Sequence, residues 1–179
     1  SSDAYVRRGK EMTLEQLTRA ADAVVLGRCT NKSVRWVRGH IETDYEVVVS
    51  EKLKGPKAFD PGATVYMTVM GGESTTPPIT QYTELQPHMF KGEEVALFLR
   101  TTPAGTDRAR ERAARIGSKL LTTPRVVGMN QGKFTIVVDE TDGRRKLTRV
   151  NLENYGFMPQ DMVLQRVIRA VARHEVHVA

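Results

Sequence analysis

The sequence predicts a single, mainly β domain built from antiparallel strands, with a helix near each end and a helical insertion. The length of 179 residues is typical of one domain. Between residues 23 and 150, short apolar or alternating runs rich in Val, Ile, Thr and Tyr are separated by turns that contain Gly, Pro or Asp, as expected for strands. Strands and helices do not alternate along the chain, which argues against a parallel sheet.

Composition limits the kind of protein. Hydrophobic residues make up 40% of the chain and charged residues 27%, which indicates a globular rather than a disordered chain. No apolar run reaches the roughly 18 residues that indicate a membrane-spanning helix. The single cysteine, Cys29, excludes an internal disulfide and a Cys-rich zinc site. It is either a small strand residue or, beside a base or a helix N-terminus, a reactive thiol.

The first predicted element is a short helix over residues 14–21. Thr13 is a favourable N-cap, and Gln16 follows it at the spacing that completes a capping box. Apolar residues at helical spacing then form one face. These residues are Leu14, Leu17, Ala20 and Ala21.

Antiparallel strands are predicted next. Residues 23–37 and 41–53 form a long hairpin around the turn Arg38-Gly39-His40. Residues 65–70 form a third strand, which ends at Gly71-Gly72. The first half of the domain is therefore predicted to contain a hairpin and a third strand.

The second half of the domain continues this pattern. The continuous apolar run of residues 95–99 predicts a strand that is covered on both faces. Residues 126–129 and 134–138 resume the strand pattern, and residues 146–150 return across the hairpin turn Thr141-Asp142-Gly143. The complete sheet is expected to contain about six or seven strands.

Two further helices are predicted. Residues 107–121 interrupt the strand pattern and, framed by Pro103 and Pro124, could form a helix within the insertion. The chain closes with a helix over residues 157–173, in which Pro159 suits the first turn. The apolar face of this last helix consists of Val163, Leu164, Val167, Ile168 and Val171.

The spacing of the strands fits a small closed or half-closed barrel of the OB type, or a compact sandwich. Several short motifs, taken in order, bear on this choice. They are Ala21-Asp22-Ala23-Val24-Val25, Leu53-Lys54-Gly55, Gly71-Gly72, the run of residues 90–99 and residues 127–134. In this order they resemble a family of uncharacterised bacterial exported proteins, and the first hundred residues are similar to the netrin-like, or TIMP-like, OB-fold domain.

The resemblance implies an OB-like barrel core over residues 14–150, interrupted by an insertion at 101–124. It also implies an exported protein that is periplasmic, associated with the outer envelope or secreted, and whose signal peptide has been removed. The inhibitory chemistry of TIMP-type proteins is not implied, because it uses the amine of an N-terminal cysteine and residue 1 is Ser1. A fold by itself does not supply a function.

No catalytic motif stands out, so a non-enzymatic protein without a cofactor is predicted. The chain lacks a Gly-x-Ser-x-Gly elbow, a Walker phosphate-binding loop and a His-Glu-x-x-His zinc motif. His174 and His177 could hold a metal ion on one helical face or belong to a solvated tail, and no metal site is predicted. A hydrolase or metal-dependent enzyme that uses His88 or this pair is the weakest alternative.

Residues 73–91 are the predicted binding element. A connection of roughly twenty residues is uncommon in a compact domain and often carries function. Its hydrogen-bonding and aromatic side chains are Thr75, Thr76, Gln81, Tyr82, Gln86 and His88. From this segment we predict that the protein binds a protein partner in the bacterial envelope or outside the cell. Alternatively, it is an Ω-type loop that only covers one end of the barrel.

The net charge of +6 is concentrated in residues 104–125, which contain six basic and two acidic residues. The candidate binding residues of this segment are Arg108, Arg110, Arg112 and Arg115. As an alternative function, they predict binding of an anionic polymer (nucleic acid, polysaccharide or lipid headgroups) with an affinity that falls as salt rises. A solvated basic helix would contain the same residues, and aromatic residues for base stacking are sparse at 6%.

Overall fold

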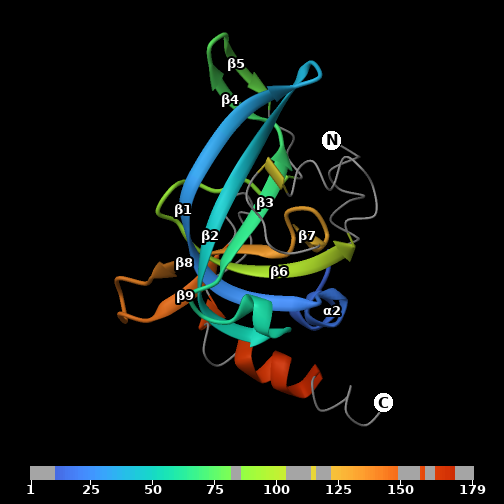
Figure 1. Ribbon diagram of the computed structural model, residues 1–179. Helices are drawn as coiled ribbons and strands as arrows, with labels where there is room; N and C mark the ends of the chain where they lie inside the picture. The colour runs from blue at the N-terminus through green and yellow to red at the C-terminus, as the bar shows by residue number, and fades with distance from the viewer. Residues whose placement is uncertain are drawn as a thin grey trace.

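The structure is a computed structural model, and it describes residues 11–81, 86–103, 114–115, 122–148, 158–159 and 164–171. Most of the described residues belong to antiparallel strands, which are long and curved in Figure 1. The predicted mainly antiparallel β class is therefore confirmed.

A short helix, α2, spans Leu14–Ala20 and confirms the predicted N-terminal helix. Thr13 begins it with the predicted capping box. The Thr13 Oγ1 accepts the Gln16 backbone N–H at 3.1 Å, and Gln16 Oε1 accepts the Thr13 N–H at 2.9 Å. These bonds satisfy two amide groups that would otherwise lack partners at the start of the helix. Leu17 is fully buried, so the helix packs on the sheet through its apolar face.

The two longest strands form the predicted hairpin. Strand β1 spans Ala23–Val37, and strand β2 spans His40–Lys54. Arg38 and Gly39 join them, with φ angles of 49° and 85°. A two-residue turn in which both φ angles are positive matches the right-handed twist of the flanking strands. The turn therefore allows both strands to continue in one extended pair.

Strands β3 and β6 flank this hairpin on its two sides. Strand β3 spans Thr64–Met70 and pairs with β2, after a short 3-10 helix, η1, at Lys57–Phe59. Strand β6 spans Glu94–Pro103 and pairs with residues 23–28 of β1. Both strands lie where the sequence predicts them.

Strand β6 is covered on both faces, as its apolar run predicts, and residues 95–99 are fully buried. Its odd-numbered side chains pack in a cluster with Tyr45 of β2, and its even-numbered side chains pack in a cluster with Leu17 of α2. The odd-numbered set is Val95, Leu97 and Leu99, and the even-numbered set is Ala96 and Phe98. The strand is thus shared by two hydrophobic cores.

Two later strands pair with different parts of β6. Strand β8, Lys133–Val138, pairs with residues 95–97, and strand β7, Thr122–Val126, pairs with residues 99–103. The sequence predicts a strand over residues 126–129, but the observed strand, β7, lies mostly before these residues in the chain. The sequence prediction used Pro124 as a boundary, but a proline, which lacks an N–H donor, is tolerated in an edge strand.

The insertion is the loop of a hairpin. Strands β6 and β7 remain paired as far as Pro103 and Thr122, so residues 104–121 connect their ends. Ala114 and Arg115 are helical, in agreement with the predicted insertion helix. The remainder of the predicted helix over residues 107–121 lies outside the described residues.

The C-terminal part of the sheet contains strand β9, Arg145–Thr148, which is the predicted return strand, and strand β10, Met158–Pro159, which pairs with β9. Strand β10 corrects the predicted start of the last helix at residue 157, because its two residues pair in the sheet. Residues 164–171 are helical as predicted, and the buried side chains are Leu164, Ile168 and Val171. Among the described residues, no helix has the length and apolar character needed to cross a membrane.

The strands form one sheet in the order β10-β9-β8-β6-β1-β2-β3, and β7 is attached to β6 off this path. Strands β3 and β7 lie next to each other. No strand pairing joins their described residues. The sheet is open along this line, so the predicted barrel is not closed in the described part of the chain.

The segment predicted as a long connection, residues 73–91, contains a second sheet. Strands β4, Gly72–Thr75, and β5, Pro78–Gln81, form a short antiparallel hairpin. Figure 1 shows this hairpin beside the turn that joins β1 and β2, at the opposite end of the molecule from residues 164–171. Part of the predicted loop is therefore a defined structural element.

The first testable prediction concerns Gly27, where β1 passes close to β2. A Cβ at this position would lie 2.5 Å from the Val48 carbonyl oxygen. We expect Gly27→Ala to lower the free energy of unfolding by about 2–4 kcal/mol, because backbone atoms must move apart. Urea denaturation followed by circular dichroism measures the loss.

Gly62→Ala is the matched control for this prediction. A Cβ at Gly62 meets no atom within 4 Å, and its φ of 92° is the only source of strain. That strain should cost about 1–2 kcal/mol. A loss at Gly27 no larger than the loss at Gly62 would contradict the close approach of the two strands.

Candidate functional site

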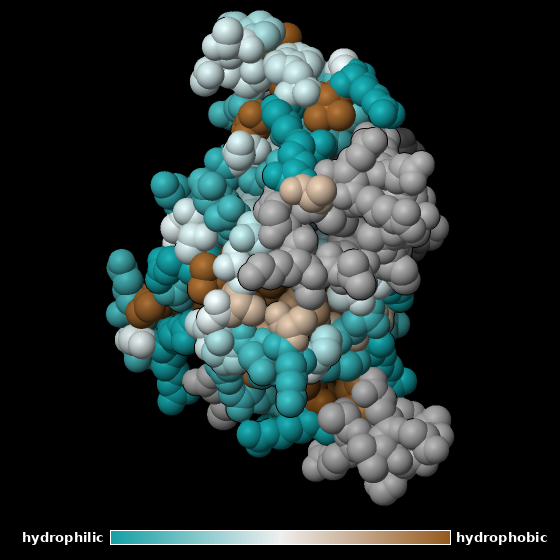
Figure 2. Space-filling view, viewed as in Figure 1, coloured by the Kyte–Doolittle hydropathy of each residue, from teal (hydrophilic) through white to brown (hydrophobic). Residues whose placement is uncertain are grey.

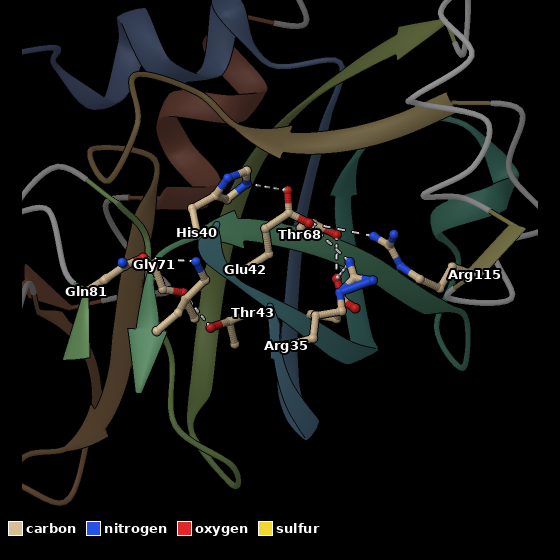
Figure 3. Close-up of polar contacts among 10 residues, drawn as sticks. Arg35, His40, Glu42, Thr43, Thr68, Gly71, Gln81 and Arg115 are labelled. Atoms are coloured by element: carbon tan, nitrogen blue, oxygen red, sulfur yellow. Dashed lines mark hydrogen bonds and ion pairs between the residues drawn. The ribbon is translucent and has the colours of Figure 1, made fainter. Parts of the chain in front are cut away.

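A short stretch of β2, residues 40–44, contacts both segments that the sequence predicts as binding elements. Side chains of a strand point alternately to its two faces. Ile41 and Thr43 lie toward the β4–β5 hairpin, whereas Glu42 on the opposite face meets Arg115 of the basic insertion (Figure 3). Two segments far apart in the sequence are thus attached to one strand.

The β4–β5 hairpin is held at its base by hydrogen bonds to this stretch. Gln81 Oε1 accepts the Ile41 N–H at 2.9 Å, and the Ile41 carbonyl accepts the Gly71 N–H at 2.8 Å. Thr43 Oγ1 donates to the Gly71 carbonyl at 2.7 Å. A Cβ on Gly72 would lie 2.3 Å from Thr43 Oγ1, so glycine permits this close approach. Gln81, a predicted binding residue, therefore has a structural contact.

The distal part of the hairpin makes a further contact with β1. Trp36 Nε1 donates to Ser74 Oγ at 3.1 Å. Thr75 and Thr76, which are predicted binding residues, are exposed at the end of the hairpin. Tyr82, which is also a predicted binding residue, lies outside the described residues. The structure thus fixes the hairpin at both its base and its middle.

His88, another predicted binding residue, ties the end of the 73–91 segment to β2 and β3. Its Nε2 lies 3.0 Å from the Met70 carbonyl, and its Nδ1 lies 2.8 Å from the Tyr45 hydroxyl. A carbonyl can only accept, so Nε2 carries the proton and Nδ1 accepts the Tyr45 O–H. The same hydroxyl accepts the Met89 N–H at 3.2 Å. Gln86 is half-buried beside this cluster, and its carbonyl accepts the His88 N–H at 3.0 Å.

The environment of His88 favours its neutral form. Burial lowers the pKa of His88 below its usual value, and the positive charges of Lys32 and Lys133 lower it further, against the opposing effect of the Met70 carbonyl. In the neutral ring, the Met70 carbonyl selects the tautomer that carries its proton on Nε2. His88 is therefore placed as a structural clamp at the base of the hairpin.

The opposite face of β2 carries a network of charged side chains centred on Glu42, which is 1% exposed. Glu42 Oε2 lies 3.3 Å from Arg35 Nη2, and Glu42 Oε1 lies 3.3 Å from His40 Nε2. Arg35 Nη2 also contacts Asp44 at 2.9 Å, and Asp44 accepts the Thr68 hydroxyl at 2.6 Å. The network spans β1, β2 and β3 across one face of the sheet.

Arg35 is incompletely paired within this network. Its Nε and Nη1 are buried and have no hydrogen-bond partner among the residues that the structure describes. A buried donor without a partner costs about 1–3 kcal/mol. Arg35 is therefore held in place chiefly through one nitrogen, and the carboxylates of Glu42 and Asp44 determine its position.

Arg115 connects the basic insertion to this network. Its Nη2 lies 3.7 Å from Glu42 Oε2, and its side chain is 40% exposed. The other predicted arginines of the segment, Arg108, Arg110 and Arg112, lie outside the described residues. Of the four predicted binding arginines, the one that the structure describes, Arg115, is thus engaged in a contact within the chain.

A second buried ion pair joins Glu93, the residue that precedes β6, to β8. Lys133 Nζ lies 2.5 Å from Glu93 Oε2, which also accepts the Thr135 hydroxyl at 2.6 Å. Glu93 Oε1 accepts the Phe90 N–H at 3.0 Å. Burial, reinforced by the nearby Glu93 charge, raises the pKa of the Cys29 thiol above its usual value. A protonated, buried thiol fits the small strand residue rather than the reactive thiol.

No constellation of metal ligands or nucleophiles emerges from these contacts. Among the described residues, no group of three or more His, Cys, Asp or Glu side chains could hold a metal ion. His174 and His177 lie outside the described residues. The contacts of this site hold chain segments together.

Sequence reasoning missed Arg35, Glu42 and Asp44. The strong alternation of the sequence Ile41-Glu42-Thr43-Asp44-Tyr45 marks the charged residues as one face of a strand. Such a face is ordinarily solvated. The burial of Glu42 depends on groups that are distant in sequence.

Comparison with known proteins does not identify a relative. No protein-family model matches the chain, and a search of curated proteins finds no significant match. The function of the site is therefore argued from its own contacts.

The second prediction tests the buried charge of Glu42. We expect Glu42→Gln to lower the free energy of unfolding by about 2–4 kcal/mol, because the amide keeps the size of the side chain but removes the charge that compensates Arg35. The matched control is Glu94→Gln, which removes a 35% exposed carboxylate that pairs with Arg28 and Arg145. That control should lose less than about 1 kcal/mol. Similar losses in urea denaturation at neutral pH would contradict the buried network.

The third prediction concerns the pH dependence that His88 introduces. Because its pKa is lowered in the native state, the unfolded chain takes up a proton at His88 at a higher pH than the native protein does. Acidification through about pH 6.5, the usual pKa of histidine, should therefore destabilise the wild type. His88→Gln should lack this contribution, so the stability difference between the two proteins should shrink as pH falls from about 8 to about 5. A constant difference across this range would refute the neutral clamp.

Proposed function

We propose that this protein is a non-enzymatic, exported binding module that engages a protein partner through the tip surface, which consists of Trp36, Ser74, Ile79 and the exposed turn residues 75–78. The observation that carries the proposal is a pair of large apolar side chains exposed at this end: Trp36 is 38% exposed and Ile79 is 39% exposed. Figure 2 shows hydrophobic residues among weakly polar ones in this region.

Both apolar side chains belong to one surface. Trp36 donates a hydrogen bond to Ser74, and Ser74 is the cross-strand partner of Ile79. Directly opposite residues of an antiparallel pair share one face. Trp36 and Ile79 therefore flank Ser74 on the same side of the hairpin.

The composition and rigidity of the tip surface support a protein partner. Tryptophan is enriched among the residues that dominate binding energy in protein interfaces. Thr75 and Thr76 supply polar groups beside it, as in the rim of such interfaces. The bonds at Ile41, Thr43 and Trp36 hold the hairpin in place, which reduces the entropy lost on binding.

The architecture is compatible with the OB-like, netrin-like barrel that the motif order implies. Strands β1, β2 and β3 are followed across the open line by β7, then β6, which returns to β1. An OB-type barrel is a partly open five-stranded barrel. The exported location rests on the same motif resemblance.

The two other predicted functions have less support. Binding of an anionic polymer through the four predicted arginines at 108–115 would use Arg115, but this arginine already contacts buried Glu42. An enzyme that uses His88 would need a ring nitrogen directed at a substrate or a nucleophile, but the nitrogens contact the Met70 carbonyl and the Tyr45 hydroxyl, which hold chain segments together. The tip surface is therefore the preferred binding element.

The fourth prediction tests the tip surface by site-specific photo-crosslinking. A photoreactive amino acid in place of Ile79 should give a discrete crosslinked product with an envelope or secreted protein, and Trp36→Ala in the same chain should remove it. The control position is Val138, which is 61% exposed and lies at the end of β8. The same products from both positions, or none at Ile79, would overturn the proposal. Circular dichroism checks that each variant is folded.

A further inference from the structure

The hairpin stem of the insertion carries two arginines side by side. Arg100 of β6 and Arg125 of β7 are direct cross-strand partners. Both side chains are exposed. Directly opposite residues of an antiparallel pair have Cβ atoms about 4.5–5.5 Å apart and point to the same face. The two guanidinium groups therefore extend from neighbouring points on one surface.

Neither arginine has an ion-pair or hydrogen-bond partner for its side chain in the part of the chain that the structure describes. Three other cations of this sheet are paired: Arg28 and Arg145 share Glu94, and Lys133 binds Glu93. Asp22 precedes β1 and lies beside this stem, where it contacts Thr101 of β6. Its carboxylate accepts hydrogen bonds from the Thr101 N–H at 2.8 Å and the Thr101 hydroxyl at 3.2 Å.

This arrangement is unfavourable for the isolated domain. Like charges that lie directly opposite in a sheet repel each other and destabilise it. The usual remedy is a carboxylate between them, and none is in ion-pair contact with either side chain among the described residues. An arrangement that lowers stability at the surface is typical of a site that is completed by a ligand.

We propose that Arg100 and Arg125 form a binding site for the phosphate group of an anionic ligand. A guanidinium presents a planar fork of donors that matches phosphate oxygens, and two of them together can neutralise a phosphate dianion. This site lies outside the tip surface and uses different strands, so it goes beyond the proposed protein-binding function.

The position of the pair favours a polymer of phosphates over an isolated phosphate. The stem leads directly into residues 104–121, whose sequence contributes five basic residues and two acidic ones. A polymer carries many phosphates, so the positive charge of this sequence adds to its electrostatic attraction, while Arg100 and Arg125 alone form the proposed site.

The test uses inorganic polyphosphate and orthophosphate as probes with the whole chain. Arg100→Gln and Arg125→Gln should each weaken polyphosphate binding about fivefold to tenfold and lower the slope of log affinity against log salt by about 1. Arg144→Gln removes the same charge from an exposed turn residue and is the matched control. It should change the affinity less than about twofold.

The two probes distinguish the source of the phosphate group. Orthophosphate binding that is lost in Arg100→Gln supports the site with free phosphate as a sufficient ligand. Binding of polyphosphate alone, lost in the same variant, supports the site with a phosphate polymer as the ligand. Absence of binding to both probes, or equal weakening by Arg144→Gln, overturns the proposal.

Thermal stability provides a second readout. Here the substitution should raise the measured value, whereas it lowers the affinity for polyphosphate. In phosphate-free buffer, Arg125→Gln should raise the melting temperature by about 1–3 °C, because it removes the repulsion across the strands. A fall in melting temperature would overturn the like-charge argument. Trp36→Ala should leave polyphosphate affinity unchanged, so a failure of the phosphate site and a failure of the tip surface can be told apart.

Discussion

Burial of β6 on both faces is the constraint on which the rest of the structure depends. Five consecutive residues, 95–99, are fully removed from solvent and divide between two hydrophobic clusters. Burial of a large apolar side chain contributes about 1.5–3 kcal/mol. Strands β1, β7 and β8 all pair with this one strand. The β1–β2–β3 sheet on one side and α2 with residues 164–171 on the other are thus joined through β6.

This central position of β6 explains why the tip needs its own support. Strand β6 pairs with β1 only over residues 23–28, whereas β1 continues to Val37 beside β2. The distal part of the long hairpin therefore extends beyond the strand that organises the core. The β4–β5 hairpin covers it there and is bonded to Ile41, Thr43 and Trp36. A two-stranded hairpin is marginally stable alone, so this mutual contact stabilises both.

Charged residues divide into two kinds in this molecule. Glu42 and Glu93 are buried, and each holds cations from other strands within a defined geometry. Such pairs are weak evidence for stability, but loss of one partner is costly. Arg100 and Arg125 are exposed and unpaired among the described residues, although they face each other across two strands. The buried carboxylates position chain segments. The exposed arginines leave positive charge available for the proposed ligand.

The sequence by itself determined the elements whose signals are local. The capping box at Thr13, the turn at Arg38-Gly39 and the apolar run at 95–99 each predicted the observed element, because capping, turn geometry and periodicity depend on neighbours in the chain. The β4–β5 hairpin was missed because its Thr-Thr-Pro-Pro stretch lacks a glycine turn signal and its support comes from β1 and β2. The burial of Glu42, the clamp at His88 and the pairing of Arg100 with Arg125 were decided by tertiary structure, since each requires groups that lie far apart in the sequence.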